Sequence, residues 1–448
     1  MRYLPHTPDE ITSMLKTIGA STVDDLFKSI PEATRVRGLL DLPEALPETK
    51  LRRHMQLLAD KNIHVEEARS FIGGGAYNHY VPSAIAPLIK RGEFLTAYTP
   101  YQPEVSQGTL QSVFEFQTMM CELTGMEVAN ASNYDLSTSC AEALMMARRV
   151  SKKARALVAR SLHPHYRDVI NTYLKNQDYE IIEIPYDKTG QVDSDFLRKN
   201  LDDSIGAVLV QSPNFFGVIE ELEVLSERMK GSNTFFIVAN PEPISYAVMQ
   251  SPGEVGAHIA IAEGMSFGLG LNYGGPYLGV FATREAYIRQ MPGRLVGETK
   301  DKEGRRGYVL TFSTREQHIR REKATSNICT NQGLMALAAS VYLSLLGPEG
   351  LKKLALVNMQ RRQHLEEQIR KKNPRALVFD GPRFNETVVK LNVPVMEAVV
   401  EILKDGIFPG VDLSNYYPEL EGHLLICTTE MNSLFDIDVL VEKLAQFL

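Results

Sequence analysis

The sequence predicts an α/β fold built on a mainly parallel β-sheet. From about residue 155 onward, short apolar runs rich in β-branched residues alternate with segments that carry apolar residues at helical spacing. This alternation is typical of parallel strands whose connecting helices cover both faces of a sheet. The strand-like runs occupy residues 154–160, 179–187, 205–213, 234–241 and 257–264, and the helical segments between them occupy residues 164–177, 193–201 and 222–231.

Three parts are expected along the 448 residues, because a chain of this length exceeds the size at which a single core stops growing. Residues 1–65 predict a helical arm, whose first helix should begin at the cap formed by Thr7 and Pro8. Residues 66–330 form the expected large domain. Residues 331–448 should contain a long linking helix and then a small α/β domain of two or three strands with two helices.

Composition and charge exclude several classes of protein. A formal net charge of −7 without a long basic run argues against a nucleic-acid surface. No apolar run approaches the ~20 residues of a membrane span, and the N-terminal residues lack the pattern of a signal peptide. The cysteines have neither close pairing nor zinc-ligand spacing, which fits a reducing cytosol. We therefore expect a cytoplasmic chain that binds no nucleic acid, membrane or metal. The cysteines are Cys121, Cys140, Cys329 and Cys427.

Residues 233–282 lack a lysine where the predicted architecture calls for one. They predict a strand, a loop, a second strand, a glycine-rich turn and a third strand. In pyridoxal-phosphate enzymes of the aspartate-aminotransferase type, the first such strand ends in an aspartate, and the second leads to the lysine that tethers the cofactor. Here the first strand ends in Asn240, and no lysine lies between Lys230 and Lys300. The pattern predicts the architecture of such an enzyme without its catalytic amine.

Two loops in the expected large domain have more than one interpretation. Residues 71–82 hold three consecutive glycines without the spacing of a nucleotide-binding loop. They fit either a turn that needs positive φ or a substrate site, which the polar residues after the glycines favour. Residues 98–108 combine tyrosines, prolines and amides on a segment that the prolines should hold extended. An interface is the favoured interpretation of that segment, and a pocket wall is the other.

Two further motifs also have a structural and a functional interpretation. Residues 135–143 should begin a helix with the hydroxyl run Ser137–Ser139, which suits either a helix cap or a phosphate site. The cap is the favoured interpretation. His163 and His165 flank a proline, with no acid or cysteine at ligand spacing, so capping or solvated histidines are favoured over a metal site.

Five stretches taken together are more specific than any one of them alone. In these stretches the chain resembles the N-terminal half of the glycine cleavage system P-protein family, a family of glycine decarboxylases. Its members are either one long chain of two homologous halves or two separate chains, and this chain is similar to the first of the two. The stretches are FIGGGAYNHYVP (71–82), YTPYQPEVSQG (98–108), NYGGPYLGVFA (272–282), MPGRLVG (291–297) and TREQHIRREKATSNICTNQ (314–332).

The resemblance implies an aspartate-aminotransferase-like large domain, which is the type I fold of pyridoxal-phosphate-dependent transferases. It implies an active site between the two halves, with the cofactor held covalently by a lysine of subunit 2 and not by this chain. The reaction implied is decarboxylation of glycine and transfer of the aminomethyl group to the lipoyl arm of the H-protein. The partners implied are subunit 2 and the H-protein, with the T-protein and L-protein of the same system acting indirectly.

The resemblance also suggests which residues of this chain reach the active site. No residue is expected to be catalytic in this chain alone. A loop supplied in trans is common in dimeric enzymes of this fold, and its candidates here would contact the phosphate of the partner's cofactor. A second group would line the pocket for glycine and the lipoyl arm. The candidates are Thr325, Ser326 and Asn327 for the phosphate, and Asn78, Tyr98 and Tyr101 for the pocket.

Two other functions stay open at this point. The chain could be an autonomous pyridoxal-phosphate enzyme that uses an unusual lysine. Lys323 lies in a run of cations that would depress its pKa, and it suits that role better than Lys300, which lies in a charged loop. The chain could also be a regulatory or scaffold subunit that shares the fold and sends no residue into the partner's site.

Overall fold

The computed structural model describes residues 5–36, 38–328 and 330–448 of the chain, so Cys329 lies outside the described residues. These residues form two units, divided between Ile63 and His64. The first unit contains helix α1 (Pro8–Ile18) and helix α2 (Glu48–Ala59), with 3-10 turns at Val23–Phe27 and Glu32–Thr34.

Helix α1 begins at the predicted cap. The Thr7 hydroxyl accepts a hydrogen bond from the Glu10 N–H at 3.3 Å, and the Glu10 carboxylate accepts one from the Thr7 N–H at 2.7 Å. The two bonds satisfy backbone donors that the first turn of a helix leaves without a partner.

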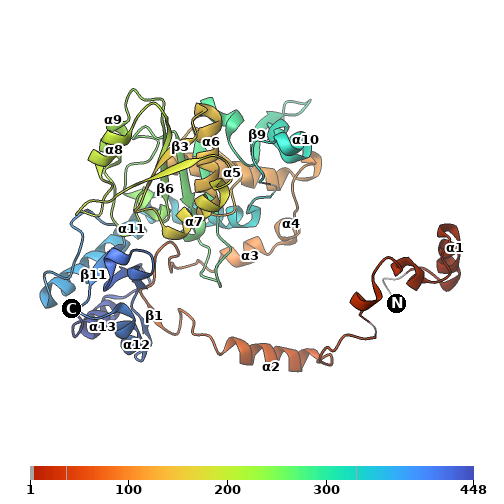
Figure 1. The fold of residues 1–448 in the computed structure, drawn as a ribbon, viewed down its shortest axis with the longest axis horizontal. Helices are drawn as coiled ribbons and strands as arrows, with labels where there is room; N and C mark the ends of the chain where they lie inside the picture. The colour runs from red at the N-terminus through yellow and green to blue at the C-terminus, as the bar shows by residue number, and fades with distance from the viewer. Residues whose placement is uncertain (1–4, 37, 329) are drawn as a thin grey trace. The chain divides into compact units, whose positions relative to one another are not determined.

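A seven-stranded sheet forms the centre of the second unit (Figure 1). Its strands pair in parallel, apart from the pairings of β8, which is antiparallel to both of its neighbours. The five predicted strand runs are confirmed, and so is the predicted mainly parallel α/β fold. In spatial order the strands are β2 (Val128–Ala129), β8 (Gly279–Thr283), β7 (Ile259–Glu263), β6 (Phe235–Asn240), β5 (Ile205–Gln211), β3 (Arg155–Ala159) and β4 (Glu180–Ile184).

Helices cover both faces of this sheet, as the apolar character of its strands requires. All residues of β5 are buried, and they alternate between two cores. Leu209 packs with α6 (Leu136–Ser151) and α7 (Pro164–Leu174) on one face. Val208 packs on the other face, which is covered by the remaining long helices. These are α5 (Gln107–Thr124), α8 (Ser194–Asn200), α9 (Leu222–Arg228) and α11 (Gly333–Lys372).

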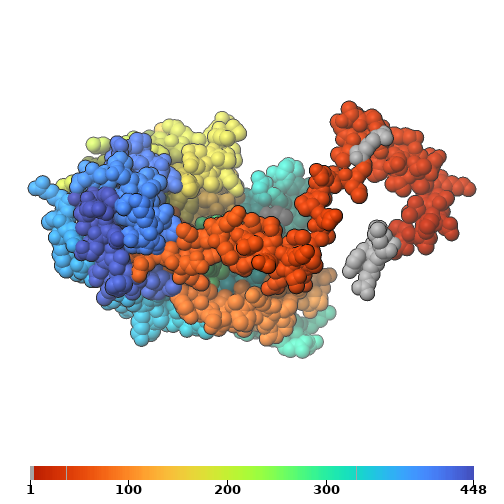
Figure 2. All heavy atoms as spheres, turned by 90° about the horizontal axis from the view of Figure 1, so that it is seen from below, coloured from red at the N-terminus to blue at the C-terminus, as the bar shows by residue number. Residues whose placement is uncertain are grey.

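The C-terminal residues form a smaller α/β layer of the second unit, which Figure 2 shows in blue. Strand β14 lies between β11 and β13 in an antiparallel sheet, and a third core cluster lies between this sheet and two helices. The two-residue strand β1 pairs in parallel with β12, so the start of the second unit is joined to this layer. The bounds are β1 (Arg69–Ser70), β11 (Glu386–Lys390), α12 (Val395–Leu403), β12 (Ile407–Phe408), β13 (Val411–Asp412), β14 (His423–Cys427) and α13 (Leu434–Leu444).

Helix α11 links the large sheet to the C-terminal layer and is interrupted at Gly347, whose φ of 60° and ψ of 179° are not helical. Among the described residues it is the one helix that is long and apolar enough to cross a membrane. Nearly half of its apolar window is buried inside the molecule, as in the core helix of a soluble protein. Ala339 and Tyr342 of this helix are buried in the main core.

One antiparallel hairpin lies outside the sequence-based expectation. Strand β9 (Leu295–Lys300) pairs with β10 (Arg306–Thr311) and packs near α5. The remaining short helices are α3 (Ile85–Ile89), α4 (Gly92–Leu95) and α10 (Gln317–Arg320).

Candidate functional site

A cavity of about 290 Å³ opens at the point where the strand order of the large sheet reverses. The chain passes from β3 outward to β4 and then returns to β5, from which the order continues toward the other edge. Ligands of open α/β sheets bind at the carboxyl ends of the strands at such a switch point. His163, which follows β3, and Phe215, which follows β5, both line this cavity, which we call the switch-point cavity.

The glycine-rich loop forms one wall of the switch-point cavity and lies against His163. The His163 Nε2 lies 2.7 Å from the Gly74 carbonyl oxygen, and its Nδ1 lies 3.1 Å from the His165 amide nitrogen. These partners fit a neutral ring that donates from Nε2 and accepts at Nδ1. Burial also lowers the pKa of His163 to about 4. The capping interpretation of His163 is therefore confirmed, and the described residues contain no cluster able to hold a metal.

Gly75 shows why this loop needs glycine. Its φ is +99°, and a Cβ atom on it would lie 2.9 Å from Cδ2 of His163. A side chain would therefore be strained by the backbone and would also collide with the histidine ring. The positive-φ interpretation of the loop is confirmed at Gly74 and Gly75, and the loop contacts the ring of His163 through the Gly74 carbonyl.

The start of α6 is closed by the chain's own acid. The Asp135 carboxylate accepts hydrogen bonds from the Thr138 N–H at 2.7 Å, the Thr138 hydroxyl at 2.7 Å and the Ser137 hydroxyl at 2.8 Å. One backbone N–H group and two hydroxyls at this helix start, which could otherwise donate to a phosphate, are thus already used by a carboxylate. The favoured cap is confirmed, with the acid as its acceptor.

The ends of β6 and β7 carry neither the aspartate nor the lysine of a pyridoxal-phosphate site. Asn240 ends β6, and its amide donates to the Ser245 hydroxyl at 2.9 Å. Glu263 ends β7, and its carboxylate accepts three backbone N–H groups, including that of Leu278 at 2.8 Å. Burial outweighs these bonds and raises the pKa of Glu263 to about 8. No lysine is among the described residues that line the cavity, so these residues do not fit covalently held pyridoxal phosphate.

A buried ionic cluster holds the next part of the loop in place. Nε2 of His79 lies 2.8 Å from the Glu242 carboxylate, and Nδ1 lies 2.9 Å from that of Glu430. Burial alone would lower the pKa of His79, but the two carboxylates outweigh it and raise the pKa to about 10. The cluster ties the loop to the residues after β6 and to the residues after β14.

The two lysines considered for an autonomous enzyme lie away from this cavity. Lys300 ends β9, and Lys323 ends a 3-10 turn (Arg321–Lys323). Both side chains are exposed, and neither lines the switch-point cavity. The geometry therefore disfavours either of them as a cofactor-bearing amine.

The residues considered for the partner's phosphate lie together on a loop between α10 and α11. The Thr325 N–H donates to the Arg315 carbonyl at 2.9 Å, and the Ser326 hydroxyl donates to the carboxylate of buried Glu142 at 2.7 Å. Asn327 accepts from the Gln317 side chain through its carbonyl oxygen at 3.0 Å. Helix α11 begins at Gly333 with Gln332 as its cap residue, so the loop does not cap that helix.

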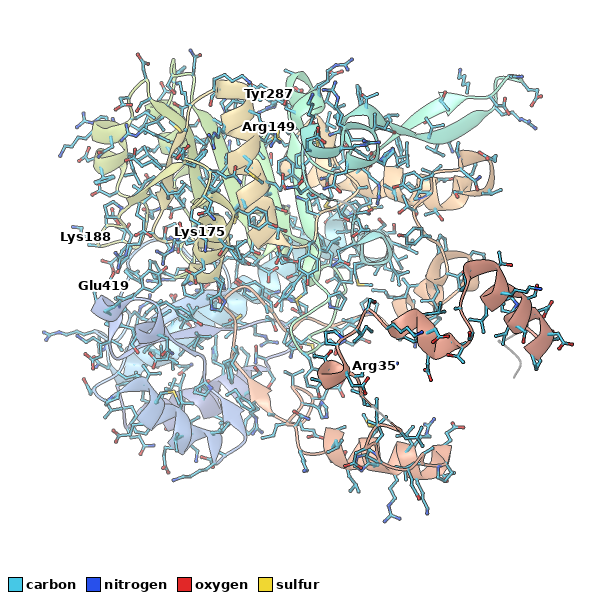
Figure 3. All side chains as sticks on the ribbon, turned by 45° about the vertical axis from the view of Figure 1, so that its right-hand side comes forward. Arg35, Arg149, Lys175, Lys188, Tyr287 and Glu419 are labelled. Carbon is cyan, nitrogen blue, oxygen red and sulfur yellow. The ribbon has the colours of Figure 1, made fainter. Side chains whose placement is uncertain are left out.

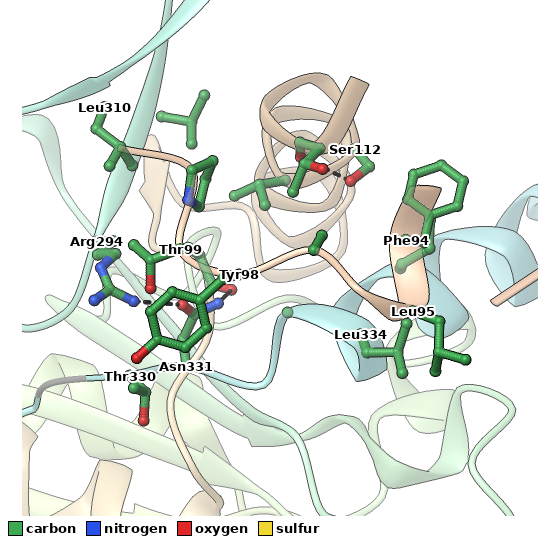
Figure 4. Close-up of a pocket in the computed structure, with 18 residues that line it drawn as sticks. Phe94, Leu95, Tyr98, Thr99, Ser112, Arg294, Leu310, Thr330, Asn331 and Leu334 are labelled. Atoms are coloured by element: carbon green, nitrogen blue, oxygen red, sulfur yellow. Dashed lines mark hydrogen bonds between the residues drawn. The ribbon is translucent and has the colours of Figure 1, made fainter. Parts of the chain in front are cut away.

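A second pocket, of about 220 Å³, is shown in Figure 4. Tyr98 is among its lining residues, and the Tyr101 hydroxyl accepts from the Arg294 guanidinium at 3.1 Å. In Figure 4, Phe94, Leu95 and Leu334 lie on one side, and Arg294, Thr330 and Asn331 lie on the other. The structure does not bring Asn78 to this pocket, because Asn78 lines a separate cavity beside the C-terminal layer.

Several residues of these sites were not singled out from the sequence, among them Glu142, Glu242, Glu263 and Arg294. Glu263 had a local signal, since it is an acid at the end of an otherwise apolar strand run. Glu242 and Arg294 had none, because their partners lie far away in the sequence.

Comparison with known proteins agrees with this geometry. The family model described as glycine cleavage system P-protein matches residues 1–444. A protein of Desulfitobacterium hafniense named probable glycine dehydrogenase (decarboxylating) subunit 1 is 48% identical over 446 residues, which cover 100% of both chains. A protein of the same name from a Geobacillus species is 46% identical over 443 residues, covering 99% of this chain and 98% of the relative.

Solved structures identify the fold as that of type I pyridoxal-phosphate-dependent enzymes, as expected. An inhibitor-bound glycine decarboxylase (P-protein) of the glycine cleavage system has a TM-score of 0.89 and 39% identity, and the match covers 100% of each chain. A Burkholderia pseudomallei sphingosine-1-phosphate lyase has a TM-score of 0.65 at 17% identity, covering 93% of this chain and 94% of the lyase, which shows the fold alone. With the full-length family match, the chain belongs to the glycine cleavage system P-protein family.

Proposed function

We propose that this chain is the subunit of a heteromeric glycine decarboxylase that does not hold the cofactor. The observation that carries the proposal is the switch-point cavity. It keeps the position of a ligand site, but its helix start is closed by Asp135, its β6 strand ends in Asn240, and no described lining residue is a lysine. A chain of this family with such a cavity needs a second chain that carries the lysine.

In this proposal the partner is subunit 2, which holds pyridoxal phosphate covalently. When bound there, the cofactor supplies the electron sink for decarboxylation of glycine. This chain supplies binding surface and exclusion of water, and the aminomethyl group passes to the lipoyl arm of the H-protein. The T-protein and L-protein act on later steps, and the assembly is cytoplasmic.

The residues of this chain have two proposed tasks in that assembly. Thr325, Ser326 and Asn327 donate to the phosphate of the partner's cofactor, supported by the hydroxyl and amide groups that their loop carries. Tyr98 and Tyr101 line the pocket for glycine and the lipoyl arm, supported by the polar end of their pocket at Arg294. Asn78 is proposed for the same pocket although it lines a separate cavity, and the effect of Asn78→Ala on glycine-dependent CO2 exchange by the complex tests this role.

An exposed apolar cluster supports an interface beside Tyr98. Two of its exposed apolar residues, Leu95 and Tyr98, line the second pocket, and Tyr98 is 83% exposed and Val105 77% exposed in the single chain. Large apolar side chains gathered at a surface mark interaction sites. An obligate interface of this kind buries on the order of 2,000 Å² or more, and two copies of each subunit are the simplest assembly. The cluster residues are Leu95, Tyr98, Tyr101, Val105 and Ile319.

Co-expression with the lysine-bearing chain of the same system tests the proposal. The two chains are expected to purify as one species, and glycine-dependent CO2 exchange is expected of the mixture and of neither chain alone. Tyr98→Asp should weaken the association, whereas the control Val224→Asp at an exposed position on α9 should not. Exchange by this chain alone at the rate of the mixture would contradict the proposal.

A further inference from the structure

The hydrogen bonds of Ser326 give a further inference about Glu142, which rests on the proposed contact between Ser326 and the partner's cofactor phosphate. Glu142 lies on α6 and is 2% exposed. Its Oε1 accepts the Ser326 hydroxyl proton at 2.7 Å, and its Oε2 is buried without a hydrogen-bond partner among the described residues. A buried polar atom left without a partner is costly and asks for an explanation.

A serine hydroxyl has one proton to donate and can accept two hydrogen bonds. The Ser326 oxygen accepts the Ile328 N–H at 3.1 Å, and its one proton goes to Glu142. With Glu142 ionised, Ser326 therefore has no proton left for a phosphate, and it would present a lone pair to that anion. With Glu142 protonated, the carboxyl group donates to the serine oxygen, and the serine proton becomes free to point at the phosphate.

We propose that Glu142 positions the hydroxyl of Ser326, and that its carboxyl group must carry a proton for Ser326 to donate to an anion. Glu142 is thus a positioning residue that never touches the anion itself. Binding of the phosphate by this loop is then coupled to the uptake of one proton by Glu142 from solvent.

The surroundings of Glu142 make its carboxyl proton harder to remove than that of a solvent-exposed glutamic acid. Burial raises its pKa, whereas the Ser326 hydroxyl and the charge of Arg149 act in the opposite direction. Arg149, labelled in Figure 3, lies on the same helix. Among the described residues it forms no ion pair with Glu142 within 4.0 Å. Arg149 donates instead to the Gln290 carbonyl at 3.0 Å. The charge of Glu142 also acts on Tyr173 of α7, and that of Arg149 acts on Arg315, which ends the 3-10 turn before α10.

Glu142→Gln tests the proposal, because the amide donates a hydrogen bond at every pH, as the protonated acid does. The dissociation constant of pyridoxal phosphate is measured by titration of the complex with the lysine-bearing partner chain between pH 6 and pH 9. Wild type should lose affinity relative to Glu142→Gln as pH rises, by up to about tenfold per pH unit once the carboxyl group is ionised. Titration of the cofactor itself affects both proteins equally and cancels in this ratio.

Two further variants complete the design. Glu122→Gln removes an exposed carboxylate from α5 and should keep the pH dependence of wild type. Glu142→Met keeps a side chain of similar volume without a titrating group. The ratio of its dissociation constant to that of Glu142→Gln should therefore not change with pH. If Glu142→Gln does not fold, Glu142→Met replaces it as the reference for wild type. Melting temperatures check folding of each variant.

Ser326→Ala separates the failure of this proposal from the failure of the proposed function. If Ser326→Ala weakens cofactor binding and Glu142→Gln removes the pH dependence, the proposal holds. If Ser326→Ala weakens binding while Glu142→Gln keeps the wild-type pH dependence, the role of Glu142 is overturned and the phosphate contact stands. If Ser326→Ala binds the cofactor as wild type does even at pH 6, where Glu142 is most protonated within the range tested, the phosphate contact is wrong, and the role of Glu142 fails with it.

Discussion

The Asp135 carboxylate accepts the Thr138 N–H at 2.7 Å, while the Asp135 N–H donates to the Thr138 hydroxyl at 3.3 Å. This reciprocal pair closes the start of α6 at the edge of the switch-point cavity. The helix end that would attract an anion by its backbone donors and its dipole therefore faces a carboxylate of its own chain. In this chain the helix start has become a structural cap.

Removal of that cap should lower stability. Asp135→Ala is expected to reduce the free energy of unfolding by about 1 kcal/mol, since the first-turn donors lose their acceptor. Urea unfolding followed by circular dichroism measures the change. Ser137→Ala on the same turn is the control and should reduce the free energy of unfolding by less. The Ser137 side chain donates to the Asp135 carboxylate and accepts no backbone N–H of the helix. An unchanged midpoint for Asp135→Ala would show that the cap does not stabilise α6.

The isolated chain should form no covalent adduct with pyridoxal phosphate at a defined lysine. Residues 231–299 contain no lysine, and no lysine is among the described residues that line the switch-point cavity. Borohydride reduction of the chain with the cofactor, followed by peptide mass mapping, should give no stoichiometric modification at one site. Stoichiometric labelling of Lys300 or Lys323 would instead support an autonomous enzyme.

Gly75 should tolerate no side chain. Gly75→Ala adds a Cβ atom 2.9 Å from Cδ2 of His163 at a φ of +99°, so the loop or the histidine ring must move. We expect a loss of about 1–3 kcal/mol in the free energy of unfolding, measured by chemical denaturation. Gly92→Ala is the matched control, because a Cβ there meets nothing within 4 Å and the backbone φ is ordinary. Equal stability of the two variants would contradict this account of the loop.

The buried cluster at His79 should make stability depend on pH. The pKa of His79 is raised to about 10, above the ordinary value of 6.5, so its contribution is complete below pH 6.5 and is lost as pH rises toward 10. Within that window the native state holds one more proton than the unfolded state. The free energy of unfolding should therefore fall by about 1.4 kcal/mol per pH unit from this group.

His79→Gln isolates this contribution. The buried acid Glu263, with a pKa near 8, adds a slope of its own, so wild type and variant are compared between pH 8 and pH 9.5. The variant should be less stable at pH 8 and should show a shallower decline above it in denaturant titrations. Parallel pH profiles for the two proteins would mean that His79 is not protonated in the cluster.

The sequence predicted the parts of this fold that depend on local pattern. Strands β5, β6 and β7 are continuous apolar runs because both of their faces are covered, and such runs are visible without a structure. The hairpin of β9 and β10 was not predicted, because the run Leu295–Lys300 is apolar only in its first half. This half is the buried part of the strand, and the charged residues that follow are exposed.

The site could be predicted less completely, because its contacts join residues far apart in the chain. The lack of a cofactor-binding lysine could be predicted from the sequence, because no lysine lies between Lys230 and Lys300. His79 meets Glu242 and Glu430 at sequence separations of 163 and 351, which no local pattern encodes. At the start of α6 the sequence-based prediction of a helix cap relied on the hydroxyl groups of residues 137–139. In the structure the carboxylate of Asp135, just before them, accepts the hydrogen bond of the cap.

The double variant Thr325→Ala with Ser326→Ala tests the proposed loop in trans. If both hydroxyls donate to the partner's phosphate, two hydrogen bonds to a charged group are lost, each worth roughly 1.5–3 kcal/mol. Titration of pyridoxal phosphate into the complex with the partner chain at pH 6, where Glu142 is most protonated within the range tested, should then show weaker binding by tens-fold or more. Sedimentation should show that the two chains still associate.

The structure sharpens what a merely structural role of this loop would look like. Because α11 begins at Gly333, the two residues do not cap it, and the structural loss would be the bond from Ser326 to buried Glu142. That loss would lower the melting temperature and leave cofactor affinity alone. Thr314→Ala, at an exposed position earlier in the same segment, is the control and should change neither quantity. Unchanged affinity of the double variant together with a lower melting temperature would assign Thr325 and Ser326 to folding and remove them from the active site.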